Sequence, residues 1–427
     1  MDTLLSLVAN DDNLSQLAEG KTKVIYAIKS DQDHVLIRSK DQLTAFNAAR
    51  KDQLQGKARI ANNTTVNVFK FLDEIGVPTH FVAKSSDSDF IAKKCEMIPI
   101  EWVARRVATG SFLKRNPGVP QGYRFAEPKI ETFFKDDEND DPQYSDEQIE
   151  CAGFEYNGIK IGKSEINVMK RMTSVIFKAL ERCWSRHNCA LIDMKVEYGI
   201  TTNGDVVLAD VIDNDSWRVW PQGDRRLQLD KQFYRDMKEV TAEALQQLIS
   251  NYEKVMDLTA EFSAPSRCRA VIIMGSPADK DHCSKIATHC TLLGITPVIR
   301  ISSAHKSTRE ALDIIAEYES DETPTVVIAV AGRSNGLGPV LAGNYTLPVI
   351  NCPPVNESTV STDIWSSLRM PSGMGCSTVL GADEAAMCAA KMMTSHDHMV
   401  YGRVLAAQLN TAIKLAKADR SCFGEKC

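Results

Sequence analysis

In the second half of the chain, short apolar segments alternate with segments whose apolar residues recur at helical spacing. Four segments have the character of buried strands: Arg269–Met274, Pro297–Ile301, Thr325–Val330 and Pro348–Cys352. The segment Ser307–Glu319 has the character of an amphipathic helix. Wholly apolar strands that alternate with such helices form parallel sheets covered on both faces. The pattern predicts an α/β, three-layer, flavodoxin-like domain whose ligands bind at the carboxyl ends of the strands.

The first 230 residues mix short β-rich segments with turns. Leu191–Val196 and Asp205–Val211 predict a hairpin, because Thr202–Asn203–Gly204 between them is a turn signal. Residues 231–259 contain few breakers and predict one helix of roughly 20 residues or more. The small, polar stretch AEFSAPSR that follows predicts a junction between domains 1–260 and 261–427.

Charge and apolar content limit the class of protein. Among 427 residues, 50 basic and 56 acidic side chains give a net charge of −6, which argues against nucleic acid as a partner. No apolar run approaches the roughly 20 residues that cross a membrane, and the N-terminal residues do not predict a signal peptide. The 12 cysteines are scattered without a CxxC pair, so we expect no zinc site and reduced thiols in the cytoplasm.

The predicted hairpin concentrates charged residues. Asp193, Lys195 and Glu197 alternate along its first strand and therefore share one face, and Asp210 lies at the end of its second strand. A divalent metal would offset the cost of burying such acids, and oxygen ligands beside a lysine that reaches phosphate are typical of ATP sites. A solvated charged face explains the same pattern and stays open at this point.

Three further segments combine charge with turns. Glu19–Lys23 places a glycine among lysines before a strand, Trp102–Ser111 brings two arginines to a Thr-Gly-Ser turn, and FFKDDENDDP is an acidic loop. Arginines beside such a turn suit a phosphate or a carboxylate. Taken singly, the first two segments are equally consistent with a surface turn and with helix-surface arginines. For the acidic segment, composition alone favours a solvated loop. An EF-hand is excluded because Asp141 stands where that motif requires glycine.

Six separated motifs of the first domain match one family in order. The motifs are EGKTKVIY, SKDQLTAFNAAR, IPIEWVARRVATGSF, FFKDDENDDP, LIDMKVEYG and ADVIDNDSWR. They resemble the phosphoribosylaminoimidazole-succinocarboxamide synthetases of purine biosynthesis. The resemblance implies an ATP-grasp-like α+β fold that uses ATP and Mg²⁺. It also implies that carboxyaminoimidazole ribotide condenses with L-aspartate through an acyl phosphate. By position it assigns Lys21, Lys23 and Lys135 to ATP, Glu197 and Asp210 to Mg²⁺, Lys195 to the reacting phosphates, and Asp41, Arg105, Ser111, Asp141, Asp215 and Arg218 to the ribotide.

In the second domain, polar and glycine-rich segments follow the predicted strands. Gly275 and Ser276 after the first strand open a helix, an arrangement that suits a phosphate. The segment SSAHKST after the second strand offers His305 as an acid or base, the alternative being a capped loop histidine. The three glycines of AGRSNGLGP after the third strand permit close approach of the backbone to a ligand, the alternative being a mobile turn.

Five segments of the second domain carry a second resemblance: MGSPAD, SAHK, AGRSNGLGPV, VINCPP and PSGMGCSTV. They resemble the class II phosphoribosylaminoimidazole carboxylases, which use CO₂ directly without ATP or biotin. By position the resemblance assigns Ser276 and Asp279 to the ribotide, Ser303, His305 and Lys306 to the reacting end, and Ser334 and Asn335 to CO₂. The pairing of both families on one chain resembles the bifunctional enzymes of animals. That likeness implies a homo-octamer built on the carboxylase domains.

Two positions depart from the family patterns. Phe46 stands where glycine is usual, and Ala278 replaces a hydroxyl-bearing residue. These departures are compatible with a non-catalytic scaffold homologue. A related ligase that acts on a different substrate and an FMN-binding module also fit parts of the pattern. Retention of four residues favours the bifunctional enzyme: Lys195, Glu197, Asp210 and His305.

Overall fold

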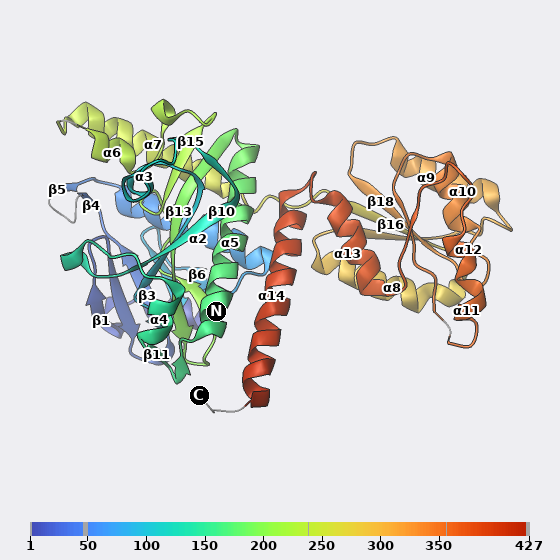
Figure 1. Cartoon of the computed structure of the whole chain (residues 1–427), viewed down its shortest axis with the longest axis horizontal. Helices are drawn as coiled ribbons and strands as arrows, with labels where there is room; N and C mark the ends of the chain where they lie inside the picture. Colours follow the sequence, from blue (N-terminus) through green and yellow to red (C-terminus); the bar gives the residue numbers. More distant parts are fainter. Residues whose placement is uncertain (1, 46–49, 238, 356, 424–427) are drawn as a thin grey trace. The chain divides into compact units, whose positions relative to one another are not determined.

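The computed structural model describes residues 2–45, 50–237, 239–355 and 357–423, so Phe46 lies outside the described residues. The chain divides into two compact units. The first unit comprises Met1–Ser263 together with Ala406–Cys427, and the second comprises Ala264–Leu405. Figure 1 shows strands covered by helices in each unit.

The first unit contains a five-stranded antiparallel sheet in the order β1-β2-β3-β7-β6. Its strands are β1 (Leu14–Glu19), β2 (Lys23–Ile28), β3 (Asp31–Ser39), β7 (Asp89–Lys93) and β6 (Phe81–Lys84). Helix α2 (Lys57–Ile75) packs against β3 and β6. Most of its apolar side chains are buried, and Phe69 and Leu72 are fully so, which means that this helix and the sheet share one core.

A six-stranded sheet surrounds the long strand β13 (Cys189–Thr201), and helix α5 (Lys163–Arg186) packs on that strand. The other strands are β10 (Arg124–Phe134), β9 (Ile100–Val107), β14 (Val206–Ala209), β15 (Trp217–Pro221) and β8 (Cys95–Met97). The predicted hairpin is confirmed, because β13 pairs with β14 in an antiparallel register that sets Glu197 opposite Ala209. Asp210, the next residue, therefore lies beside Glu197.

The prediction of one helix over residues 231–259 is wrong in its first part. The chain forms α6 (Gln232–Asp236), leaves helical geometry at Met237, and starts α7 (Ala242–Ala260) only after Thr241. The Thr241 hydroxyl accepts a hydrogen bond from the Ala244 N–H at 3.2 Å. A residue that caps a helix in this way has non-helical backbone, so a helix cannot continue through it.

Short elements complete the first unit. These are α1 (Asp2–Val8), α3 (Ser111–Arg115), α4 (Asp146–Cys151), β4 (Gln42–Ala45), β5 (Arg50–Gln53), β11 (Glu155–Tyr156) and β12 (Ile159–Lys160). Helix α14 (His398–Phe423) begins in the second unit, and its residues from Ala406 onward belong to the first. None of the helices in the described part of the chain has the length and apolar character needed to cross a membrane.

The second unit contains a parallel five-stranded sheet, as predicted. Its strands are β16 (Arg269–Met274), β17 (Thr296–Ile301), β18 (Thr325–Val330), β19 (Val349–Asn351) and β20 (Ser377–Thr378). The spatial order β17-β16-β18-β19-β20 is the 2-1-3-4-5 order of flavodoxin-like, doubly wound sheets.

Helices cover both faces of this sheet. Ala270 and Ile272 of β16 lie in one apolar cluster, while Val271 and Ile273 lie in another. The first cluster includes residues of α8 (Lys280–Leu292), α13 (Ala382–Met393) and α14, and the second includes residues of α9 (Thr308–Glu319) and α10 (Leu337–Asn344). Because successive residues of a strand point to opposite faces, the unit has three layers. Two short helices, α11 (Val360–Asp363) and α12 (Trp365–Leu368), follow β19.

Candidate active sites

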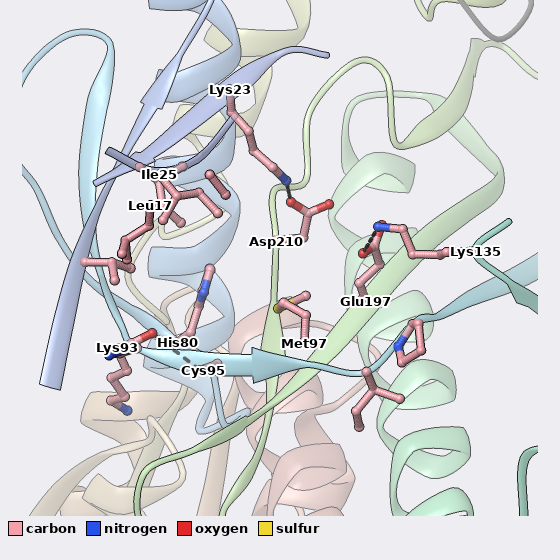
Figure 2. A pocket seen from close by; sticks show the side chains of 16 residues that line it. Leu17, Lys23, Ile25, His80, Lys93, Cys95, Met97, Lys135, Glu197 and Asp210 are labelled. Atoms are coloured by element: carbon pink, nitrogen blue, oxygen red, sulfur yellow. Dashed lines mark hydrogen bonds and ion pairs between the residues drawn. The ribbon is translucent and has the colours of Figure 1, made fainter. Parts of the chain in front are cut away.

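A cavity of about 470 Å³ in the first unit is lined by residues of both sheets. Apolar side chains, among them Leu17, Ile25 and Met97, line part of its wall. Figure 2 shows two lysine–carboxylate pairs in the same cavity, Lys23 with Asp210 and Lys135 with Glu197. The cavity therefore combines an apolar surface with a concentration of charge.

The Glu197 carboxylate lies at the centre of the charged cluster in this cavity. It accepts hydrogen bonds from Lys135 at 2.7 Å and from Lys195 at 2.5 Å, and Lys195 also reaches Glu101 at 2.8 Å. Burial acts to raise the pKa of Glu197, but Lys195 and Lys135 lower it to about 2. Burial acts to lower the pKa of Lys195, but Glu197 and Glu101 raise it above its usual value. At neutral pH both Glu197 and Lys195 are therefore ionised.

The backbone positions of Asp210 and Lys23 bring their side chains together at the wall of the cavity. Asp210 follows β14 directly and has a φ of 62°, in the left-handed region that aspartate tolerates better than most residues. Lys23 is the first residue of β2, and burial lowers its pKa to about 8. This half-buried lysine pairs with the Asp210 carboxylate at the cavity wall.

The loop after β10 connects three of the predicted residues. Lys135 begins this loop, and Asp141 closes it by accepting a hydrogen bond from the Asp136 N–H at 2.8 Å. Lys21, on the turn before β2, reaches Asp137 of the same loop at 2.9 Å. Of these residues only Lys135 lines the cavity, so Lys21 and Asp141 are grouped with it through the loop.

A second cluster contains the predicted arginines. The Asp193 carboxylate accepts hydrogen bonds from Arg105 at 2.5 Å and from Arg218 at 2.8 and 2.6 Å, and Arg105 also bonds Glu131 at 2.5 Å. A Cβ at Gly110 would lie 2.5 Å from Arg218, so only glycine allows the guanidinium this close to the turn before Ser111. The fold thus brings Arg105, Ser111 and Arg218 together.

A third cluster surrounds Asp215. Its Oδ2 accepts from Lys57 at 3.4 Å and from Lys231 at 3.1 Å, and its Oδ1 accepts from the Tyr252 hydroxyl at 3.3 Å. Asp41 accepts a hydrogen bond from the N–H of Ala58, the residue after Lys57, at 2.8 Å. Asp41 and Asp215 are therefore joined through the start of α2.

The second unit has a cavity of about 530 Å³ at the carboxyl ends of β16, β17 and β18. Six predicted side chains line this cavity: Ser276, Asp279, Ser303, His305, Lys306 and Ser334. A Cβ at Gly336 would lie 2.7 Å from His305 Nε2, so glycine allows the loop to pack against the imidazole. The parallel sheet gathers residues from three loops at the edge where its ligands were expected.

Asn335 differs from the other predicted residues of this loop. It is 3% exposed and is not part of the cavity wall. Its Nδ2 donates to Asn351 Oδ1 at 2.9 Å and to Ser367 Oγ at 3.0 Å, and its Oδ1 accepts from the Gly338 N–H at 3.1 Å. Asn335 therefore fixes the loop through hydrogen bonds on the side away from the cavity.

Comparison with known proteins connects each cavity to a family. Residues 16–251 match the SAICAR synthetase family, and residues 269–413 match the AIR carboxylase family. A protein of Rattus norvegicus, named bifunctional phosphoribosylaminoimidazole carboxylase/phosphoribosylaminoimidazole succinocarboxamide synthetase, is 53% identical over 95% of this chain and 96% of its own length. The chain belongs to this bifunctional family. The predicted family is confirmed, and the hypothesis of a non-catalytic homologue gains no support.

Further members of the bifunctional family match equally long stretches. A protein of Caenorhabditis elegans, named probable multifunctional protein ADE2, is 59% identical over 98% of this chain and 99% of its own length.

Among solved structures, a SAICAR synthetase (Type-2) in complex with ADP covers 56% of this chain and 98% of its own chain, with a TM-score of 0.50 and 32% identity. The first unit therefore has the fold of SAICAR synthetases.

The charged end of the first cavity fits the chemistry of a magnesium ion. Glu197 and Asp210 offer carboxylate oxygens, which this ion prefers. Among the described residues, no group of three or more His, Cys, Asp and Glu side chains is arranged to hold a metal. Mg²⁺ usually takes one or two carboxylates and completes its shell with water and phosphate oxygens, so two protein ligands are sufficient.

Sequence reasoning missed several residues of these clusters. Lys57, Lys231 and Tyr252 contact Asp215 from three separate elements, and no local pattern sets them apart. Glu131 is different, because this charged residue is 4% exposed and stands in IETFF of β10, a run in which three of five residues are apolar. A buried carboxylate in such a run needs a partner, and that signal could have connected it with Arg105.

Proposed function

We propose that the chain catalyses two consecutive steps of purine biosynthesis. The second unit carboxylates aminoimidazole ribotide with CO₂, without ATP or biotin, and the first unit condenses the product with L-aspartate at the expense of ATP. One observation supports this reading above all: four of the residues assigned by the synthetase motifs line a cavity in the first unit, and six of those assigned by the carboxylase motifs line a cavity in the second.

The first cavity suits a nucleotide, and a similar SAICAR synthetase was solved with ADP. In this proposal the first unit is an ATP-grasp-like ligase in which Lys21, Lys23 and Lys135 hold the phosphates. Glu197 and Asp210 would hold Mg²⁺, which neutralises phosphate charge when it is bound. Lys195 keeps its proton and stabilises the negative charge that develops on the reacting phosphates.

A carboxylate is a poor electrophile, which is why the proposal includes an acyl phosphate. The ribotide carboxylate attacks the γ-phosphorus of ATP and releases ADP. The aspartate amine then attacks the acyl carbon, and phosphate leaves with the original carboxylate oxygen. Arg105, Ser111 and Arg218 would bind the ribotide phosphate, because paired guanidinium groups match phosphate geometry. Asp41, Asp141 and Asp215 would contact the rest of the ribotide.

The carboxylation needs no nucleotide, because the aminoimidazole is an enamine whose C4 is nucleophilic. C4 forms a bond to the carbon of CO₂, and C4 then loses its proton, for which His305 is the proposed base. Ser276 and Asp279 would hold the ribotide, with Ser303 and Lys306 at the reacting end. Ser334 would position CO₂, and Asn335 would support it by fixing the loop.

We further propose functional domains 1–260 and 261–427 that act in the cytoplasm as a homo-octamer built on the carboxylase domains. Large apolar side chains that are exposed on the second unit support contacts between copies. They include Ile299, Ile301, Trp365 and Leu368. Light scattering on the purified chain should give eight times its 47.3 kDa mass, and a monomer mass would contradict this part of the proposal.

An isotope experiment tests the ligase step. Carboxyaminoimidazole ribotide labelled with ¹⁸O in its carboxylate is converted with aspartate and Mg-ATP, and the released phosphate is analysed by mass spectrometry. An acyl phosphate requires that one carboxylate oxygen leaves with each phosphate. Phosphate without the label, at normal turnover, would contradict the proposed intermediate.

A further inference from the structure

His80 stands out in the first cavity because it is a buried polar side chain whose Nε2 has no protein partner. It precedes β6, lines the cavity wall and is 3% exposed. Its ring packs against Phe69 and Phe90, with centroid distances of 5.3 and 5.8 Å. Among the described residues, no group hydrogen-bonds its Nε2. A buried nitrogen left unpaired costs free energy, so the atom calls for an explanation.

The backbone of His80 is fixed on both sides. Its N–H donates to the Leu208 carbonyl at 2.9 Å, and its carbonyl accepts from the Lys93 N–H at 2.6 Å. Burial, reinforced by the positive charges of Lys23 and Lys93, lowers the pKa of the imidazole to about 3. The ring is therefore neutral at physiological pH and can make one hydrogen bond through Nε2 without bringing a charge into the cavity.

The position of His80 indicates which part of a ligand it would meet. In Figure 2 it lies on the same side of the cavity as Leu17 and Ile25, away from the Lys135–Glu197 pair. If the phosphates occupy the charged end, the flat apolar base lies at the other end, beside His80. A purine base carries polar atoms on its edge, and these would need partners in an apolar wall.

We propose that His80 is a specificity-determining residue whose Nε2 hydrogen-bonds the 6-amino group or N7 on the edge of the adenine base. The inference rests on the proposed use of ATP by the first unit. A neutral hydrogen bond of this kind changes affinity by about 3- to 10-fold. His80 would thus select the base, while the lysines bind the phosphates.

The test compares His80→Phe with His80→Gln in the full chain. Phenylalanine keeps a ring between Phe69 and Phe90 but has no nitrogen, whereas glutamine keeps a polar group. Calorimetry measures the Kd of Mg-ATP and of two analogues, purine riboside triphosphate, which lacks the 6-amino group, and 7-deaza-ATP. His34→Phe is the matched control, because His34 lies outside the cavity and hydrogen-bonds Asp31 at 2.9 Å.

We expect His80→Phe to weaken ATP binding about 3- to 10-fold and to bind one analogue as well as the wild type does. His80→Gln should retain most of the affinity, and His34→Phe all of it. Equal ATP affinity in His80→Phe, or an equal loss for all three nucleotides, would overturn the inference. Failure of the wild-type chain to bind ATP would instead refute the proposed function on which the inference rests.

Discussion

Replacing Asp193 by Asn tests whether the buried charge network around the predicted arginines stabilises the first unit. The Asp193 side chain is 7% exposed and holds two arginines, of which Arg105 is 5% exposed and Arg218 18% exposed. Removing one partner of a buried ion pair costs about 3–5 kcal/mol, because it leaves a buried charge uncompensated. Glu131 still pairs with Arg105 in the variant, so we expect the lower end, about 3 kcal/mol.

Urea unfolding followed by tryptophan fluorescence measures this change. Four of the five tryptophans lie in the first unit, so a Trp365→Phe background reports on that unit alone. The matched control is Glu253→Gln, which removes a pair with Arg59 at 3.1 Å in which both side chains are almost half exposed. Exposed pairs contribute about 0–1 kcal/mol. Equal stability of Asp193→Asn and Glu253→Gln would refute the reasoning.

Of three further predictions, two test the activities of the two units separately and the third tests the pH dependence of stability. Lys195→Met should lower synthetase turnover about 100-fold or more, because it removes a half-buried cation from the reacting phosphates, while carboxylated ribotide still accumulates at the wild-type rate. His305→Asn should lower carboxylase turnover about 100-fold or more and leave the conversion of supplied carboxylated ribotide unchanged; loss of both activities would contradict this division. Burial raises the pKa of Asp230 to about 7, so the folded state keeps a proton that the unfolded chain releases above about pH 4. The free energy of unfolding should therefore fall as the pH rises from about 4 to 7, and Asp230→Asn should lose this component of the slope in urea titrations; identical slopes would argue against a buried, protonated carboxyl.

The parallel sheet of the second unit follows from local pattern. Strands such as Thr325–Val330 were predicted with the bounds that the structure has, because fully buried strands are apolar throughout. The residues at their carboxyl ends, such as His305, then meet in one cavity by topology. Asn335 shows the limit of this reasoning, because a loop pattern does not tell which side chains turn inward.

The first unit was harder to predict because its site depends on contacts that are distant in sequence. The hairpin could be predicted from its turn, and its register places Asp210 beside Glu197. In contrast, Lys57 reaches Asp215 across 158 positions, and no local spacing records that contact. The break before Thr241 was missed because a threonine in a helix-rich stretch is a weak signal until its hydroxyl is seen to cap α7.

A drop-out assay on the purified chain tests the central claim most directly. Aminoimidazole ribotide, bicarbonate with CO₂, aspartate and Mg-ATP are supplied together and then with single components omitted, and products are identified by mass. The account predicts succinocarboxamide ribotide in the full mixture and only carboxylated ribotide when ATP is omitted. Dependence of the carboxylation itself on ATP, or no conversion of either ribotide by folded protein, would contradict it.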